Sequence, residues 1–407
     1  MKKAISVLAL SSIFIAGSAM ASGYRIPEQS VDSTAKAGAN VASAQRGDAA
    51  YFNPANMSWM ADSWHTEFDA TYIYLSPIDY EDSRSARFNA ESEDEHFLLP
   101  QLHMVSPSFG GARIGLSIVE PYGLSKRWKD AYPKAAAEEF SLAVIEVNPT
   151  VSYSFAKMVS VAGGVRMLYA DATVKSDASG LGRPLSREME GDTVEWGWNA
   201  AVSVKPMDKL NLSATYRSNV DLDFDDKAKL NLLGKRMTLD AEVSVPAPAV
   251  FAMSAAYDVL ENLNVELTWD RTFWSQYEEL DFDFSPAIPG NPYEPAVPKD
   301  WEDTDAFRIG ITYGVTKSLD LMLGFAYDEN PVPDDKINFE LPDSDAWIYS
   351  IGAQYKVSEK MDIGVAMLYD YKESRKVQVV RADSVYPYGE FTDASAILVT
   401  VGMNYRF

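Results

Sequence analysis

Hydrophobic and polar residues alternate with a period of two along most of the chain from residue 64 to its end. The last sixteen residues show this best, because one parity is apolar and ends in aromatic residues, whereas the other is mostly small or polar. Successive side chains of a strand point to opposite faces, so this segment suits a barrel wall between hydrocarbon and a watery lumen. The apolar parity consists of Ile397, Val399, Val401, Met403, Tyr405 and Phe407.

Fourteen segments show this alternation, an even number within the range of bacterial outer-membrane barrels. Residues 237–245 also alternate, but we assign them to a loop, because an odd count would place the two chain ends at opposite rims. The fourteen segments lie near residues 64–78, 97–106, 111–121, 140–155, 159–174, 193–205, 208–224, 248–258, 262–279, 304–315, 319–329, 345–357, 361–378 and 392–407.

The connections between these segments alternate in length, which supports the count. Short turns at one rim and long loops at the other are the expected periplasmic and extracellular ends of such a barrel. The sequence therefore predicts an all-β membrane protein, a 14-stranded antiparallel outer-membrane β-barrel. Short connections include 205–208, 316–318 and 358–360, and long ones cover 79–96, 122–139, 175–192, 225–247, 280–303, 330–344 and 379–391.

The first 21 residues have the features of a secretory signal peptide, since Lys2 and Lys3 precede an apolar run and the small-residue site Ala19-Met20-Ala21. Its removal takes two positive charges away and changes the formal net charge from −23 to −25. A chain so acidic is poorly suited to nucleic acid. Cysteine is absent, the three histidines lack metal-ligand spacing, and no nucleophile elbow is present. We therefore expect no metal, no cofactor and no catalytic residues.

Residues 22–63 are rich in small residues and do not alternate, so they fit either a plug inside the barrel or a periplasmic linker. They contain an Asn-Pro-Ala tripeptide at 53–55, shortly after Asp48-Ala49. With further motifs in the same order, this segment resembles the outer-membrane long-chain fatty acid transporters of the FadL type, over nearly the whole mature chain. The further motifs are Tyr216-Arg217-Ser218, Trp274-Ser275-Gln276-Tyr277, Asp305-Ala306-Phe307-Arg308-Ile309, Asn330-Pro331-Val332-Pro333-Asp334 and Leu341-Pro342-Asp343.

The resemblance implies a hatch formed by residues 22–63 inside a barrel formed by residues 64–407. A ligand would meet an apolar groove between long extracellular loops, enter an apolar pocket, and leave sideways beside a kink in the third strand. It also implies a gate at Asp48, Asn53, Pro54 and Ala55, and a kink at Gly110, Gly111 and Gly115. From the residues alone, Asn-Pro also begins plain turns, and glycine is common in barrel strands.

Family members hold the ligand head group with an arginine on the fifth strand and a lysine before the tenth. Here Asp171 occupies the fifth-strand position, with Lys175 nearby. Three arginines have lumenal parity, since one on the lipid side at mid-membrane would cost roughly 2–4 kcal/mol; they could bind the ligand or pair with lumenal carboxylates. The candidate ligand-binding residues are Arg166, Arg217, Arg308, Lys299, Leu230, Leu232, Leu233 and Met237.

We therefore expect a channel in the outer membrane of a Gram-negative bacterium that takes up long-chain fatty acids passively, through hatch movement and lateral release. Asp171 differs from the arginine that the family has at this position, and a hydrocarbon needs no head-group cation, so a channel for aromatic or aliphatic hydrocarbons is the alternative. A lipid hydrolase and an open porin are weaker alternatives. Expected partners are a hydrophobic ligand, outer-membrane lipid and lipopolysaccharide, and the barrel-assembly machinery through the C-terminal strand, with a monomeric state.

Overall fold

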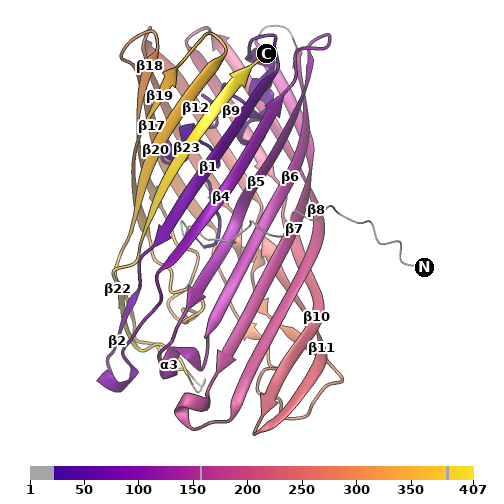
Figure 1. Ribbon diagram of the computed structural model, residues 1–407, viewed down its shortest axis with the longest axis vertical. Helices are drawn as coiled ribbons and strands as arrows, with labels where there is room; N and C mark the ends of the chain where they lie inside the picture. Colours follow the sequence, from indigo (N-terminus) through magenta and orange to yellow (C-terminus); the bar gives the residue numbers. More distant parts are fainter. Residues whose placement is uncertain (1–22, 156–157, 382–384) are drawn as a thin grey trace, which may run out of the picture.

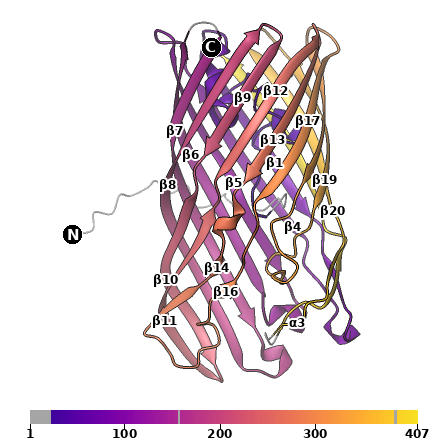
Figure 2. The ribbon, with the colours of Figure 1, turned by 180° about the vertical axis from the view of Figure 1, so that it is seen from behind.

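The computed structural model describes residues 23–155, 158–381 and 385–407, so the expected signal peptide lies outside the described residues. The chain forms a closed antiparallel β-barrel (Figures 1 and 2). Its main sheet has 17 strands, of which three (β10, β11 and β15) extend one side and the other fourteen close the barrel through the pairing of β1 with β23. The fourteen are β1 (His65–Leu75), β4 (Glu95–Val105), β5 (Ala112–Arg127), β6 (Glu139–Phe155), β7 (Val159–Asp177), β8 (Leu185–Met207), β9 (Leu210–Arg217), β12 (Val250–Leu260), β13 (Leu263–Thr272), β17 (Thr304–Gly314), β18 (Leu319–Asp328), β19 (Ala346–Lys356), β20 (Met361–Lys372) and β23 (Ser395–Arg406).

The two rims differ in the length of their connections, which confirms the predicted asymmetry. Turns at the rim that carries the C-terminus are short, as between β8 and β9 or between β12 and β13 (Figure 1). Segments at the other rim are long and contain small elements of their own. These are β2 (Asp79–Asp82), η2 (Ala86–Phe88), β3 (Ala90–Glu91), α3 (Ala131–Lys134), η3 (Ser179–Leu181), η4 (Trp274–Gln276), β14 (Glu279–Leu280), β15 (Phe282–Ser285), β16 (Val297–Pro298), β21 (Arg375–Val377) and β22 (Gly389–Thr392).

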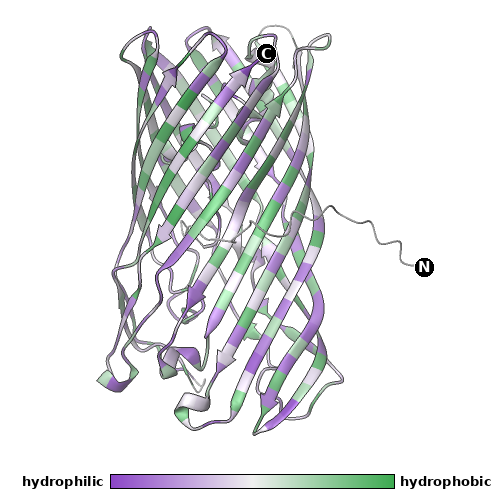
Figure 3. Cartoon of the chain, viewed as in Figure 1, coloured by the Kyte–Doolittle hydropathy of each residue, from purple (hydrophilic) through white to green (hydrophobic). Residues whose placement is uncertain are grey.

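Hydrophobic and hydrophilic residues alternate along many strands of the wall, as green and purple bands show (Figure 3). Exposed apolar side chains on the outer face alternate with buried ones on the inner face. On β23, Val401 is 53% exposed on the outer face, whereas Leu398 and Thr400 are buried. Arg166 and Arg308 are buried and paired with acidic side chains of neighbouring strands, so their predicted lumenal orientation is confirmed. No helix in the described ranges is long and apolar enough to cross a membrane.

The assignment of residues 237–245 to a loop is wrong. They belong to β11 (Lys235–Ala247), which pairs along its whole length with β10 (Val220–Leu232). The intervening Leu233 and Gly234 have φ values of 54° and 88°, as a two-residue type I′ hairpin turn requires. The hairpin continues the wall beyond β9 and β12, from which only short breaks separate it, and so the barrel still closes with fourteen strands.

Residues 23–63, which we call the N-terminal segment, contain α1 (Val31–Ala35), α2 (Ala49–Phe52) and η1 (Pro54–Trp59) and are mostly buried. Strands from all sides of the wall hold this segment through hydrogen bonds. The bonds include those of Gln29 O with His103 on β4, of Thr34 with Thr400 on β23, of Ala35 O with Ser350 on β19, of Ala37 O with Arg308 on β17, and of the Val41 and Ala42 amides with Glu266 on β13.

Candidate functional site

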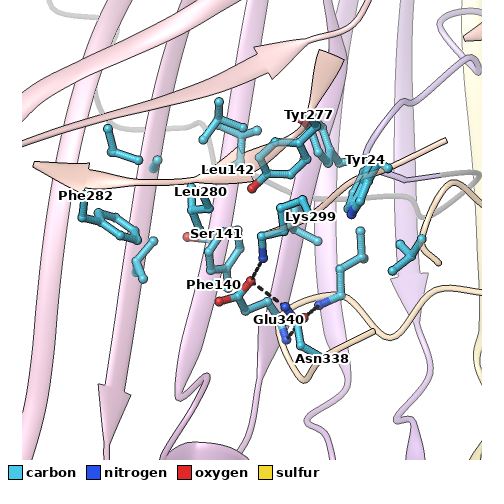
Figure 4. Close-up of a pocket in the computed structure, with 18 of the residues that line it drawn as sticks. Tyr24, Phe140, Ser141, Leu142, Tyr277, Leu280, Phe282, Lys299, Asn338 and Glu340 are labelled. Carbon is cyan, nitrogen blue, oxygen red and sulfur yellow. Dashed lines mark hydrogen bonds and ion pairs between the residues drawn. The ribbon is translucent and has the colours of Figure 1, made fainter. Parts of the chain in front are cut away.

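A narrow apolar cavity lies toward the rim of long segments, bounded by inward-facing side chains of β6, β7, β10 and β11 (Figure 4). Its volume is about 50 Å³, below the roughly 300–1,000 Å³ of most small-molecule sites. A long ligand must therefore displace lining side chains or loops. The lining residues are Tyr24, Leu124, Phe140, Ser141, Leu142, Ala172, Val174, Phe224, Val243, Val245, Tyr277, Leu280, Phe282, Lys299, Trp301, Val332, Lys336, Asn338, Glu340 and Leu341.

The N-terminal segment contributes one wall of this cavity through Tyr24. The Tyr24 ring packs edge-on against Trp274 with 4.6 Å between centroids, and Trp301 lies 5.0 Å from both Trp274 and Tyr277. Residue 23 must be glycine here, because its φ is +68° and an added Cβ would lie 2.4 Å from the Trp274 ring. Movement of the N-terminal segment would therefore change the shape of the cavity.

Lys299 is the one predicted ligand-binding cation that lines the cavity. It is buried and forms an ion pair with Glu340, which also accepts a hydrogen bond of 3.0 Å from Asn338 Nδ2 (Figure 4). Burial favours the neutral acid, but the Lys299 ammonium outweighs it and holds the pKa of Glu340 below its usual range. The pair leaves this part of the apolar cavity with no net charge.

Arg187 on β8 adds a second buried cation, which the sequence interpretation did not single out. Its guanidinium lies 4.7 Å from the centroid of Phe282 and 5.1 Å from that of Tyr293, and the residue is 8% exposed. It makes no ion pair with any described residue, and its Nε has no hydrogen-bond partner. Its inward parity, which it shares with Leu185 and Met189, is the feature of the sequence that could have identified it.

The three predicted arginines are held by carboxylates and do not line the apolar cavity. Arg166 donates from Nε to Glu146 at 2.9 Å, and Arg217 pairs with the other oxygen of the same carboxylate. Arg308 binds Asp270 and Asp328, each at 2.8 Å. Pairing with lumenal acids, the second role considered for them, is thus what the structure shows. Arg217 also lines a second cavity, of about 50 Å³, beside Tyr51, Pro121 and Tyr122.

The fifth strand of the barrel, β7, has no cation at Asp171, where the resemblance implied one. Asp171 on β7 shares the outward parity of Tyr169 and is exposed. Lys175 has the same parity and pairs with Glu139 at 3.2 Å and Glu190 at 3.0 Å. Arg187 on the adjacent strand β8 is a buried cation in the same part of the wall, because its register partner on β7 is Ser176.

The predicted apolar candidates on β10 and β11 lie near the cavity without lining it. Leu230 is buried in the apolar cluster that surrounds the cavity, and Leu232 and Met237 pack against that cluster. Leu233 occupies the hairpin turn and is 79% exposed.

The predicted gate residues hold the N-terminal segment together. Asp48 is buried and accepts hydrogen bonds from Ser30 Oγ at 2.9 Å and Asn40 Nδ2 at 2.7 Å. Burial, reinforced by the charge of Asp32, raises the pKa of Asp48 to about 6.

The Asn-Pro-Ala tripeptide begins the short helix η1. Asn53 Oδ1 accepts from Ala55 N at 3.1 Å, and Asn53 Nδ2 donates to Ser203 on β8 at 2.9 Å. Pro54 starts the helix at the position where a missing N–H costs nothing. Asn53 thus bonds to β8, while Ala50 and Met57 on either side of the tripeptide lie against Gly115 of the third strand, β5.

The third strand does have an irregularity, but not at the predicted glycines. Gly110 and Gly111 form the turn before β5, with φ values of 65° and 92°, and Gly115 lies in a regularly paired part of it. The register shift falls between Val119 and Tyr122. Only four residue pairs join β4 to β5, from Val105↔Gly115 to Leu102↔Ile118.

Toward the rim of long segments the backbone pairing of β4 and β5 stops after these pairs, and contact resumes only where Ser125 Oγ donates to Glu95 at 2.6 Å and Glu93 N donates to Arg127 O at 2.9 Å. We call the gap in between the β4/β5 break. The N-terminal segment covers the β5 edge there. Ile26 N donates to Pro121 O and Gly123 N donates to Tyr24 O, each at 2.8 Å, around an antiparallel bridge between Arg25 and Tyr122. Any passage through the break therefore requires residues 24–26 to leave this edge.

Comparisons with known proteins agree with this architecture. Residues 12–407 match the profile of a family described as outer membrane protein transport protein (OMPP1/FadL/TodX). A long-chain fatty acid transport protein of Escherichia coli O6:H1 is 27% identical, with 99% of this chain and 98% of that protein aligned. Outer membrane protein P1 of Haemophilus influenzae is 22% identical, with 99% of each chain aligned.

Solved structures show the same fold. A Pseudomonas aeruginosa FadL homologue superposes with a TM-score of 0.84 at 19% identity, over 95% of this chain and all of that chain. The Pseudomonas putida toluene transporter TodX superposes with a TM-score of 0.69 at 18% identity, over 93% of this chain and 98% of that chain. Because the profile covers nearly the whole chain, this outer-membrane barrel belongs to the OMPP1/FadL/TodX family of transport proteins.

Proposed function

We propose that the barrel takes up long-chain fatty acids or closely similar anionic amphiphiles. The main support for this proposal is the buried guanidinium of Arg187, which makes no ion pair or hydrogen bond with a described residue, close to an apolar cavity in which Glu340 forms its ion pair with Lys299. An apolar site gains about 0.8 kcal/mol for each CH₂ group that it buries, whereas the guanidinium offers two parallel hydrogen bonds to a carboxylate. A hydrocarbon would gain only from the burial of its apolar groups.

The N-terminal segment, residues 23–63, acts as the hatch in this proposal. Its Tyr24 lines the cavity and its residues 24–26 cover the free edge of β5, so one movement would both widen the cavity and uncover the break. The ligand then leaves sideways through the β4/β5 break. This route keeps an acyl chain in apolar surroundings instead of an aqueous pore.

Uptake of aromatic or aliphatic hydrocarbons is the second candidate. It is favoured by the exposed, outward position of Asp171, since the family's fifth-strand cation is missing, and by the likeness in fold to a toluene transporter. No described group of acidic or histidine side chains could hold a metal ion.

We propose further that the barrel works as a monomer, contacts outer-membrane lipid and lipopolysaccharide, and is recognised through β23 by the assembly machinery.

Uptake of radiolabelled oleate tests the proposal in Gram-negative cells that lack their own outer-membrane fatty acid transporter. Cells that express this chain should accumulate oleate faster than cells with an empty vector, and the Arg187→Met variant should lose most of the gain. Equal accumulation with and without the protein would contradict the proposal. Faster accumulation of labelled toluene, with none for oleate, would establish the hydrocarbon channel instead.

A further inference from the structure

The β4/β5 break contains an acidic side chain with no partner. Glu120 lies at the register shift of β5 and is only 5% exposed. Both backbone polar groups of Glu120 are hydrogen-bonded, since its N–H donates to Gln29 Oε1 at 3.1 Å and its carbonyl accepts from Gln29 Nε2 at 2.8 Å. Its carboxyl group makes no hydrogen bond or ion pair with any other described residue.

Two buried polar atoms without partners lie where the pairing of β4 and β5 ends. His103 and Ser117 face each other across the two strands, and neither residue is exposed. His103 Nε2 lies 2.9 Å from Gln29 O, which can only accept, so Nε2 carries the hydrogen and Nδ1 is left as an acceptor. Both His103 Nδ1 and Ser117 Oγ have no partner among the described residues.

Gln29 joins these groups, because its side chain holds the Glu120 backbone and its carbonyl holds His103. Native structures rarely leave buried polar atoms unpaired, and here such groups gather at one interruption of the wall. A carboxylate buried without a cation is costly, whereas a neutral carboxylic acid can donate a hydrogen bond. The break therefore offers donors and acceptors for one polar group.

We propose that Glu120, with His103 and Ser117, forms a transfer site that binds the carboxyl head group of a fatty acid as it passes the β4/β5 break. The proposal rests on the proposed uptake of fatty acids and deepens it. Arg187 and Lys299 hold the head group in the cavity, and the transfer site takes it over at the wall. In the absence of ligand, the N-terminal segment covers this site through Gln29.

Two substitutions of Glu120 separate head-group binding from a purely structural role. Glu120→Leu removes the hydrogen-bonding group, whereas Glu120→Gln keeps both a donor and an acceptor of the same size. Initial rates of labelled oleate uptake are measured in cells, and the affinity for a fluorescent long-chain fatty acid is measured on the purified full-length barrel. Glu242→Leu, which changes an exposed acid on β11, is the matched control.

The Leu variant should lower oleate uptake at least fivefold while the affinity stays within twofold of wild type. The Gln variant should keep more than half of the uptake rate, and the Glu242 control should keep all of it. Unchanged or faster uptake by the Leu variant would overturn the transfer site, as would equal losses in both Glu120 variants or a parallel loss of affinity. A wild-type barrel that neither binds nor takes up oleate would instead overturn the proposed function itself.

Discussion

Replacement of Arg187 by methionine is the sharpest test of how the cavity recognises a head group. Methionine fills similar space between Phe282 and Tyr293 but cannot donate a hydrogen bond. Glu340 is the carboxylate whose charge acts on Arg187, but it keeps its ion pair with Lys299, so the substitution leaves no buried negative charge without a partner and the barrel should fold normally. Its effect should therefore fall on ligand binding.

The expected loss of affinity follows from the interaction that is removed. A hydrogen bond to a charged group contributes about 1.5–3 kcal/mol, and 1.4 kcal/mol is a factor of ten, so affinity for palmitate should fall roughly 10- to 100-fold. Hexadecane makes no such bond, and its affinity should stay within twofold or rise slightly.

Isothermal titration or displacement of a fluorescent fatty acid measures both affinities on the purified barrel. Arg187→Lys should recover part of the palmitate affinity, because it keeps the charge but not the paired donors. Arg183→Met, which removes an exposed arginine from the preceding segment, serves as the control. An unchanged palmitate affinity in Arg187→Met, or equal losses for palmitate and hexadecane, would refute the reasoning.

Three other predictions concern the wall and the N-terminal segment. Arg166→Met should lower the free energy of unfolding by about 3–5 kcal/mol, because it removes the fully buried partner of Glu146. Arg217→Met should cost less, because the Arg217 side chain is 12% exposed and its pairing is less buried. Thermal unfolding in detergent measures both, and equal losses would contradict the ranking. Burial raises the pKa of Glu28 to about 7 and that of Asp48 to about 6, so the packed N-terminal segment binds protons that a detached one releases. Its packing should therefore weaken as the pH rises from about 4.5 to 7, by about 3 kcal/mol for Glu28 alone; hydrogen exchange of residues 23–63 should show this, and the pH dependence should shrink in Glu28→Gln. Because the chain has no cysteine, Arg25→Cys with Tyr122→Cys can lock residues 24–26 to β5. Oxidation should stop oleate uptake and reduction restore it, each single variant should not respond, and uptake by the oxidised pair would argue against this route.

The barrel could be predicted from the sequence because its cause is local. Each strand needs one apolar face toward lipid, so hydrophobic and polar residues alternate in every strand. The two rims can be told apart by the lengths of their connections. The same reasoning misassigned β11. We counted only strands that cross the membrane, and a hairpin that continues the wall past the fourteen strands was therefore taken for a loop. Its hairpin turn at Leu233-Gly234 was the signal that identifies it.

The site was less predictable because it depends on contacts between distant residues. Inward parity was correct for Arg166 and Arg308, but parity does not reveal that Glu146 and Asp270 already hold them. Arg187 has the same parity and no partner, a difference that only the assembled barrel shows. The break in β5 falls at Glu120 and Pro121, next to the N-terminal segment, and the glycines lie elsewhere.

The most direct test of the account is competition on the purified full-length barrel between a bound fluorescent fatty acid and four ligands: palmitate, methyl palmitate, hexadecane and toluene. Palmitate and methyl palmitate have the same acyl chain and differ in the charge of the head group. The account predicts that palmitate displaces the probe at least tenfold more effectively than methyl palmitate or hexadecane. Displacement by hexadecane or toluene at lower concentrations than palmitate would contradict it and identify a hydrocarbon channel.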